Sequence, residues 1–420
     1  MTDARSRLRH GRLSLAVSFF IQGAVFALLV TRIPAIQTRY GISDGLLPAF
    51  LAAVPVLAGM GSMGTERLVA RVRPGAVLRW VQPVVGLALL AAGSGHELWQ
   101  VALALGVFGL SVGGLDASMN MLGVSLQHAY GRSIMLGFHA AYSLGGIVGA
   151  TLAWVGAHEG LSLAVLYGPV VAVAVPTALV ASRWYADRDD SRVRVRGDDR
   201  LSGRAEVSAA DRGMRFLLPL CLVMAFAYIG DSTVSNWSAK YLQDVLHSSD
   251  QVSTVPYNAY MATTLLGRAV GDLGVRRFGP VRVVRAGTVV AVCGFGVVAT
   301  APGAWVGTAG FTLLGLGLSV IVPQTFAAAG RNAEERLGAG ASDRAVARLN
   351  IFNYVGFLVG SPLVGALGEV WSYRWAMVVP MILVLATFRY APSFGPSAAR
   401  YGGGHERPST ADVGRSGNGL

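Results

Sequence analysis

Long apolar segments recur along the chain, and shorter stretches rich in polar and charged residues separate them. A helix needs about twenty apolar residues to cross a bilayer core of about 30 Å. Segments of this kind predict twelve transmembrane helices, at residues 13–36, 46–66, 77–95, 98–122, 134–156, 161–182, 216–239, 253–272, 281–300, 304–328, 347–369 and 373–391. The second segment contains two prolines and the eighth contains Arg268, so these two carry the weakest signal. The pattern predicts an all-α, multi-pass membrane protein.

Composition supports this fold class. The chain is 53% hydrophobic and 14% charged, whereas soluble domains carry about 25% charged residues. A net charge of +12 would suit a nucleic-acid partner, but the charged residues lie almost entirely between the apolar segments. We therefore expect the lipid bilayer to be a partner of this protein, and we expect no nucleic-acid partner.

The basic residues predict the orientation, because cytoplasmic loops carry an excess of Lys and Arg. With the N-terminus inside, Arg32, Arg39, Lys240 and Arg374 fall at the outer side, Arg268 falls within a span, and the other basic residues fall at the cytoplasmic side. Both termini are then cytoplasmic. Six tryptophans at predicted outer ends and two at inner ends fit the aromatic belts of a membrane protein.

The chain divides into two six-helix halves that resemble each other. The predicted organisation is a cytoplasmic N-terminus, an N-terminal half, a cytoplasmic linker, a C-terminal half and a disordered cytoplasmic tail, at residues 1–12, 13–182, 183–215, 216–391 and 392–420. An offset of 206 residues pairs Gly61–Glu66 with Gly267–Asp272, and an offset of 211 pairs Gly145 and Gly149 with Gly356 and Gly360. Both halves begin inside, so they form a parallel repeat, as in one large class of secondary transporter.

Several motifs resemble those of the major facilitator superfamily. The stretch from Gly267 to Gly279 is similar to the superfamily's loop signature between its second and third helices, here in the second half, and the first-half copy has Glu66 where an Asp is usual. A bacterial branch of fucose-permease-like carriers is suggested by five further stretches, which are Thr31-Arg-Ile-Pro34, Gly114-Leu-Asp116-x-x-x-Asn120, Phe138-His139, Asn236-Trp237-Ser-Ala-x-Tyr241-Leu242 and Ile321-Val-Pro323. The resemblance covers roughly residues 12 to 390.

Polar side chains in the fourth and fifth spans are candidates for coupling. Asp116 and Asn120 are four residues apart on one helix face, and His139 lies at a similar depth, so these three residues are predicted to form one cluster. An ionisable group in a span costs about 2.5–3.5 kcal/mol on insertion scales and usually serves a function. The resemblance implies that Asp116 binds the coupled proton, and it also implies an acid on the first helix, where this chain has Gln22. The alternative is that Asp116 and Asn120 only tie helices together and His139 only packs.

Further candidates lie at both ends of the spans. Neutral polar residues could line the solute cavity, namely Gln22, Asn120, His139, Gln324, Asn350, Asn353 and Tyr354. Arg32, Asp231 and Asn236 are candidates for an outer gate, with separate groups reaching the interface as the alternative. In the loop signature, the candidates for a conformational lock are Gly267, Arg268, Gly271, Asp272, Arg276 and Arg277, because Asp272 could accept hydrogen bonds from a helix N-terminus.

These features favour a secondary transporter of a small polar, sugar-like solute, coupled to protons and working by alternating access. No nucleophile–base set, metal-ligand spacing or P-loop occurs in the sequence, so we expect no enzyme activity, no catalytic residue, no metal and no cofactor. The expected location is the bacterial cytoplasmic membrane, and the expected state is a monomer. An exporter of a small metabolite or drug, or a transport-inactive sensor, stays open as the alternative.

Overall fold

The computed structural model describes residues 2–43, 46–186, 214–253, 255–338 and 340–395. Within these ranges every regular element is a helix. The long helices of the N-terminal half are α1 (Thr2–Thr31), α3 (Leu47–Leu68), α4 (Pro74–Ser94), α5 (Leu98–Tyr130), α6 (Met135–His158) and α7 (Leu163–Ala181). Those of the C-terminal half are α9 (Leu218–Asp244), α11 (Val255–Phe278), α12 (Pro280–Thr300), α13 (Ala304–Leu318), α14 (Ile321–Leu337), α15 (Ala341–Val370) and α17 (Val378–Tyr390). Short helical turns connect them, at α2 (Ile33–Tyr40), η1 (Ser182–Trp184), η4 (Met214–Leu217), α10 (Asp250–Ser253), α16 (Tyr373–Ala376) and η5 (Ala391–Phe394).

The helical membrane architecture is confirmed. In the described part of the chain, ten helical segments are long and apolar enough to cross a membrane. The helices outside this set are α3 and α11, which correspond to the two spans with the weakest sequence signal. They are 22 and 24 residues long and pack inside the bundle with the others. The structure is thus compatible with twelve spans.

Several helices are longer than their predicted spans. Helix α1 starts at Thr2, inside the segment assigned to a cytoplasmic N-terminus, α5 continues to Tyr130, and α14 continues to Leu337. Hydropathy falls at these cytoplasmic ends, but the backbone stays helical because polar residues such as Arg and Glu are good helix formers. The sequence therefore places the membrane boundary better than it places the helix end.

The predicted cytoplasmic linker and the predicted tail lie mainly outside the described residues. Of the linker, residues 187–213 are not described, and of the tail, residues 396–420 are not described. The prediction that the disordered tail starts at residue 392 is wrong for its first residues, because η5 packs against the bundle there. The backbone carbonyl of Phe394 accepts a hydrogen bond from Arg331 at 2.5 Å, and the side chain of Phe394 is fully buried.

The predicted tenth span is broken in the middle. Its two parts, α13 and α14, are separated at Ser319 and Val320. Pro323 has no backbone N–H, so it cannot bond to the carbonyl four residues before it. The carbonyl of Ser319 therefore has no helical partner, and the helix restarts at Ile321. The equivalent span of the first half, α5, has no proline and runs unbroken.

Glycines set the closest helix contacts within each half. The repeat pair Gly145 and Gly149 places α6 directly against α1, where a Cβ would overlap with the backbone of Phe20 or Ala24. Its counterpart, formed by Gly356 and Gly360, places α15 against α9 in the same way. Small residues allow this close backbone approach in membrane helices. The repeat predicted from spaced glycines is thus a repeat of helix packing.

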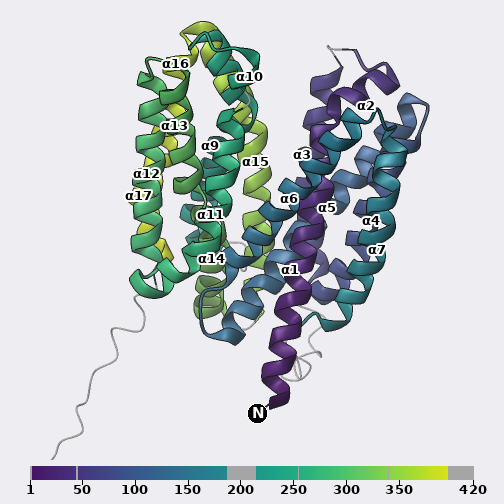
Figure 1. Ribbon diagram of the computed structural model, residues 1–420. Helices are drawn as coiled ribbons and strands as arrows, with labels where there is room; N and C mark the ends of the chain where they lie inside the picture. Colours follow the sequence, from purple (N-terminus) through teal and green to yellow (C-terminus); the bar gives the residue numbers. More distant parts are fainter. Residues whose placement is uncertain (1, 44–45, 187–213, 254, 339, 396–420) are drawn as a thin grey trace, which may run out of the picture.

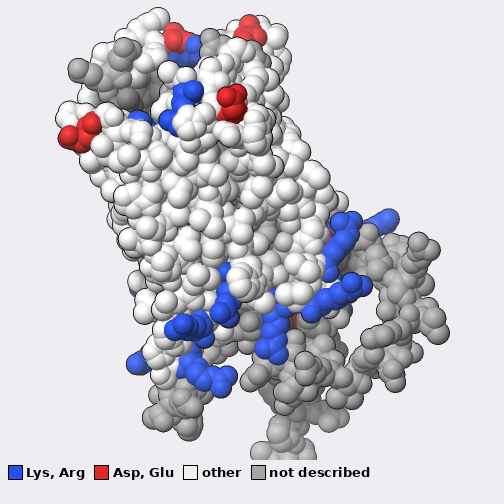
Figure 2. Space-filling view, turned by 90° about the vertical axis from the view of Figure 1, so that its right-hand side faces the viewer, with Lys and Arg blue, Asp and Glu red and all other residues white. Residues whose placement is uncertain are grey.

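The two halves lie side by side, the N-terminal half in purple to teal and the C-terminal half in green to yellow (Figure 1). Between them, α3 packs against α15, α6 packs against α11, and α5 packs against α15 and α14. Figure 2 shows a broad uncharged band, with Lys and Arg gathered at the lower end, which is the end that carries the N-terminus in Figure 1. This distribution fits the positive-inside orientation, and we call this lower end the basic end.

Candidate functional site

The carboxylate of Asp116 contacts the other half of the molecule. Asp116 lies near the middle of α5, and its Oδ2 accepts a hydrogen bond from the hydroxyl of Tyr354 on α15 at 2.5 Å. Both side chains are partly exposed. A hydrogen bond to an ionised carboxylate is stronger than one between neutral groups. Asp116 is therefore an ionisable group in a span whose partner belongs to the opposite half.

The predicted cluster of Asp116, Asn120 and His139 does not form. Asn120 donates to the backbone carbonyl of Asp116 at 2.8 Å, within its own helix. His139 is buried beside the ring of Phe19, with a centroid distance of 5.4 Å, and stacks on the ring of Phe326 across the two halves at 6.2 Å. His139 thus packs among aromatic rings, as the alternative reading expected, although its Nε2 atom is buried without a hydrogen-bond partner.

The polar candidates of α14 and α15 contact the opposite half. Asn350 donates to Ser62 on α3 at 3.3 Å and accepts from Asn353 at 2.9 Å. Gln324 on α14 lies 3.5 Å from the hydroxyl of Ser133. The contacts of Gln324 and Asn350 thus join the two halves in this structure, while Asn353 bonds within α15.

Gln22 does not lie with the other cavity candidates. It is 2% exposed and faces the interior of the N-terminal half, where it lines a small pocket together with Val85, Gly86 and Ala174. Helices α1, α4 and α7 surround this pocket. In this structure Gln22 therefore lies within the N-terminal half, and its place in a solute cavity stays a prediction.

The outer-gate residues are separate in this structure. Asp231 on α9 accepts a hydrogen bond from Tyr260 of the neighbouring α11, within its own half. The Asn236 amide donates to a backbone carbonyl one turn earlier in α9, that of Ser232, at 2.9 Å. The described residues show no ion pair between Arg32 and Asp231. The predicted pairing is therefore not present when the basic end is closed.

A group of polar residues near mid-span was only partly predicted. Arg268 on α11 donates from Nη1 to the hydroxyl of Ser143 on α6, across the halves, at 2.6 Å. Tyr142 and Tyr228 each interact electrostatically with both Asp116 and Arg268. We call the central polar cluster the set formed by Asp116, Tyr142, Ser143, Tyr228, Asp231, Tyr260, Arg268 and Tyr354. The sequence analysis missed four members, and for three of them, Tyr142, Tyr228 and Tyr260, the available signal was a tyrosine inside a predicted span.

The loop signature holds the two halves together at the basic end. Asp272 is 6% exposed, and its two carboxylate oxygens accept hydrogen bonds from the Ser133 hydroxyl at 2.5 Å and from the backbone N–H of Gly137 at 3.0 Å. Gly137 lies in the first turn of α6, so Asp272 interacts with the positive end of that helix. Arg276 donates from Nε and Nη2 to the carbonyl of Ser133, at 3.1 and 2.6 Å.

The other signature residues divide into packing and surface positions. A Cβ at Gly267 would overlap with Ser319 at the break between α13 and α14, and a Cβ at Gly271 would overlap with Leu136 of the other half. Both glycines thus let α11 approach its neighbours. Arg277 is exposed, and its guanidinium lies over the ring of Phe278.

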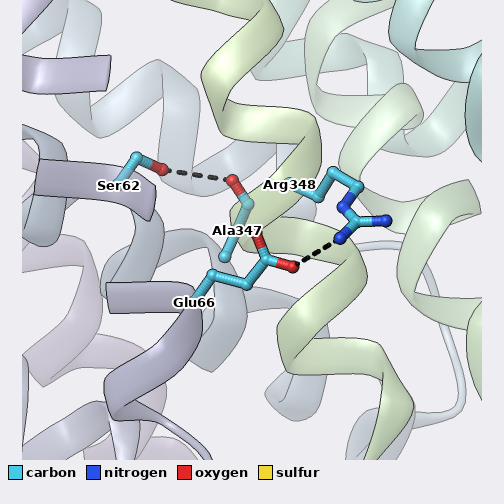
Figure 3. Close-up of polar contacts among 4 residues, drawn as sticks. All are labelled: Ser62, Glu66, Ala347 and Arg348. Carbon is cyan, nitrogen blue, oxygen red and sulfur yellow. Dashed lines mark hydrogen bonds and ion pairs between the residues drawn. The ribbon is translucent and has the colours of Figure 1, made fainter. Parts of the chain in front are cut away.

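The degenerate first-half copy of the signature also joins the halves. Figure 3 shows Glu66 and Ser62 of α3 facing Arg348 and Ala347 of α15. The Glu66 carboxylate and the Arg348 guanidinium form an ion pair at 3.1 Å, and the Ser62 hydroxyl donates to the Ala347 carbonyl at 3.1 Å.

In the described residues, no three His, Cys, Asp or Glu side chains are grouped as a metal site would need.

Comparison with known proteins agrees with this architecture. The family model of the Major Facilitator Superfamily matches residues 133–342 and 220–396, which together cover more than half of the chain. The chain therefore belongs to the major facilitator superfamily, a family of multi-pass membrane transporters. An uncharacterized MFS-type transporter of Yersinia pestis is 27% identical over 379 residues, which is 89% of this chain and 93% of the relative.

Solved structures share the fold at low sequence identity. The crystal structure of the superfamily transporter FucP in the outward conformation matches with a TM-score of 0.72 and 16% identity, over 92% of this chain and 99% of that chain. A second structure, described as the E. coli fucose:proton symporter FucP, matches with a TM-score of 0.69 and 16% identity, over 92% and 98% of the two chains. The predicted all-α membrane fold and the predicted superfamily are thus confirmed, and the fold is similar to that of FucP.

Proposed function

We propose that this protein is a proton-coupled secondary transporter that moves a small polar solute across the bacterial cytoplasmic membrane by alternating access. The observation that carries the proposal is the hydrogen bond between Asp116 and Tyr354. It places a titratable carboxylate of one half against a hydroxyl of the other, at the level where the halves meet. The structural neighbour described as a fucose:proton symporter supports a polar, sugar-like solute.

The bond between Asp116 and Tyr354 links proton binding to the conformation. Tyr354 donates to the carboxylate, and this bond is strongest when Asp116 is ionised. A proton on Asp116 removes the negative charge and weakens the bond, so it lowers the free-energy cost of separating the halves at the basic end. The protonated, solute-loaded protein then opens toward the cytoplasm, and ionised Asp116 returns it to the closed basic end.

The chain has Gln22 where the resemblance implies an acid on the first helix. Asp231 provides a second acid in the other half, and its electrostatic interaction with Arg268 connects it to the central polar cluster. We propose that proton coupling depends on Asp116 and needs no acid on α1. The contacts of Asp272, Arg276 and Glu66 would then hold the basic end closed until Asp116 is protonated.

Transport by purified protein in proteoliposomes tests this proposal. A panel of labelled sugars, polyols and sugar acids is offered with an inward proton gradient, and we expect accumulation of at least one of them. Asp116→Asn should abolish gradient-driven accumulation but retain exchange of the same solute between the two sides, because exchange needs no net proton movement. Asp244→Asn, an exposed acid paired with Lys240 outside the cluster, is the matched control and should accumulate like the wild type.

Two results would contradict the proposal. Undiminished accumulation by Asp116→Asn would show that the proton is carried elsewhere. The second result is that no solute in the panel is transported, although a cooperative thermal unfolding transition shows that the protein is folded. This result would favour the transport-inactive sensor.

A further inference from the structure

Arg268 is a cation of the central polar cluster that forms no ion pair among the described residues. Its Nη1 donates to the hydroxyl of Ser143, a neutral acceptor, at 2.6 Å. Its Nε is buried and has no hydrogen-bond partner. Among the described residues, no carboxylate forms an ion pair with it within 4.0 Å. One edge of a permanently charged guanidinium is thus left without an acceptor.

The two carboxylates of the cluster already have other partners. Asp116 accepts from Tyr354, and Asp231 accepts from Tyr260. Both act on Arg268 or its neighbours only through longer-range electrostatics. Neither acid lies within ion-pair distance of the guanidinium, so neither fills its free edge in this structure.

A charged group in a span is costly unless it has a partner or a function. Arginine remains charged in proteins, and its planar fork of N–H donors matches the two oxygens of a carboxylate. Arg268 as a whole is partly exposed, while its Nε atom is buried, so a carboxylate reaches the free edge when the helices that cover Nε move apart during alternating access. Tyr142 and Tyr228 lie within electrostatic range of it and add hydroxyl groups.

We propose that Arg268 binds a carboxylate of the transported solute, and that the solute is a hydroxylated carboxylic acid of the sugar-acid class rather than a neutral sugar. The free guanidinium edge takes the carboxylate, and the tyrosine hydroxyls of the cluster take the hydroxyl groups. This inference rests on the proposed transport function and specifies the solute of the same site. Because Arg268 is bonded to Ser143 of the opposite half, a solute bound there contacts both halves.

Binding measurements test the inference without requiring transport. The probes are D-glucuronate, D-galacturonate and D-gluconate, each compared with its neutral partner, D-glucose, D-galactose and D-glucitol. Binding is measured from the concentration dependence of the thermal unfolding temperature of the purified protein, because a ligand that binds the folded state raises that temperature. We expect at least one carboxylate to stabilise the wild type more than its neutral partner does.

Three variants assign the effect to Arg268. Arg268→Gln should weaken binding of the carboxylate about 10- to 100-fold, the range expected for loss of charge-assisted hydrogen bonds. Arg268→Lys keeps the charge but loses the Nε edge, so its binding should fall between those of Arg268→Gln and the wild type. The matched control is Arg79→Gln, which removes an exposed guanidinium that lies over Trp80 at the end of α4, and its binding should equal that of the wild type.

The inference is overturned if no carboxylate stabilises the wild type more than its neutral partner, or if the stabilisation persists in Arg268→Gln. If Arg268→Gln does not fold, Arg268→Lys provides the test, and carboxylate binding as tight as that of the wild type would overturn the inference. The outcome is distinct from that of the transport proposal. Proton-driven accumulation of a neutral solute alone would contradict the proposal of a carboxylate solute and support the proposal of proton-coupled transport. Carboxylate binding at Arg268 without proton-linked flux would support the first proposal and contradict the second.

Discussion

The interfaces α6–α11 and α3–α15 occupy equivalent places in the two-fold repeat, yet they use different chemistry. In the first, Asp272 of α11 accepts from the backbone and hydroxyl groups at the start of α6. In the second, Glu66 of α3 pairs with the Arg348 side chain of α15. The repeat offset of 206 residues aligns the two acids. The acidic position is thus shared by both halves, while its partner differs.

The sequence around each helix start explains the difference. At the offset of 211 residues that relates α6 to α15, Arg348 takes the position of Gly137. The first turn of α6 has no acidic residue, so the positive end of that helix is available to Asp272. Helix α15 already begins at Ala341, seven residues before Arg348, so the equivalent position is not at the positive end of that helix. Glu66, longer by one methylene, therefore meets the Arg348 side chain at the position where Asp272 meets a backbone N–H.

The comparison indicates which interface controls the closed state. Asp272 is 6% exposed and bound on both oxygens, whereas the side chains of Arg348 and Glu66 are 29% and 17% exposed. Partly exposed ion pairs contribute about 0–1 kcal/mol, and hydrogen bonds to charged groups contribute about 1.5–3 kcal/mol each. We therefore expect α6–α11 to be the stronger of the two closures.

The largest effect is expected for Asp272→Asn. Loss of the charge weakens both hydrogen bonds to the start of α6 and should shift the equilibrium toward an open basic end by about 3 kcal/mol. Spin labels at the exposed residues Arg71 and Leu337, one in each half, report the separation by electron–electron double resonance. An unchanged distance distribution would show that α6–α11 does not control this end.

A smaller effect is expected for Asp272→Glu, which keeps the charge. The added methylene must fit a buried site where Gly271 already touches Leu136 of the opposite half, and such overpacking costs about 1–3 kcal/mol. The same spin labels should show partial opening, less than in Asp272→Asn. A distribution identical to that of the wild type would mean that the site tolerates either acid, and that the difference between the two halves has no steric basis.

Ser62→Ala should have an effect of about 1 kcal/mol, because it removes one donor to Ala347 and one acceptor from Asn350. A destabilisation of this size should lower the thermal unfolding temperature by about 1–2 °C in a chain of this length. Ser94→Ala is a suitable control, since that hydroxyl is exposed and bonds only to its own helix. If Ser62→Ala lowers the thermal unfolding temperature more than Asp272→Asn does, the ranking of the two interfaces is reversed.

The smallest effect is expected for the ion pair itself. A double-mutant cycle of Glu66→Gln and Arg348→Gln, followed by denaturant unfolding, should give a coupling free energy of about 0.5 kcal/mol. The coupling should decrease further at high salt, because exposed ion pairs are screened. A coupling above about 2 kcal/mol would place the main closure at α3–α15 instead.

Much of the fold could be predicted from the sequence, because the bilayer imposes a simple rule on hydropathy and charge. The predicted spans and orientation follow from that rule, and the predicted repeat follows from motifs at fixed offsets in the two halves. The break at Ser319 and the start of α1 at Thr2 did not follow from it, because hydropathy does not show whether a helix breaks near a proline or continues into the basic residues beyond an apolar run.

The candidate site was less predictable, because its contacts join residues far apart in the sequence. Asp116 was found as an acid in a span, but its partner Tyr354 belongs to the other half, and no local pattern connects them. Asp231 and Arg268 were assigned to a gate and to the lock loop, although helix packing brings both into the central polar cluster. Which face of a helix meets the other half depends on packing that single-span periodicity does not contain.

Solute-driven proton movement is the most direct test of proton coupling through Asp116. Proteoliposomes containing a trapped pH-sensitive dye, with no initial gradient, are given a solute that the wild type accumulates. We predict that the interior acidifies with the wild type as solute and proton enter together, and that Asp116→Asn shows no acidification while it still exchanges the solute. Equal acidification by Asp116→Asn would show that Asp116 does not carry the proton, and solute entry without acidification in the wild type would show that transport is not coupled to protons.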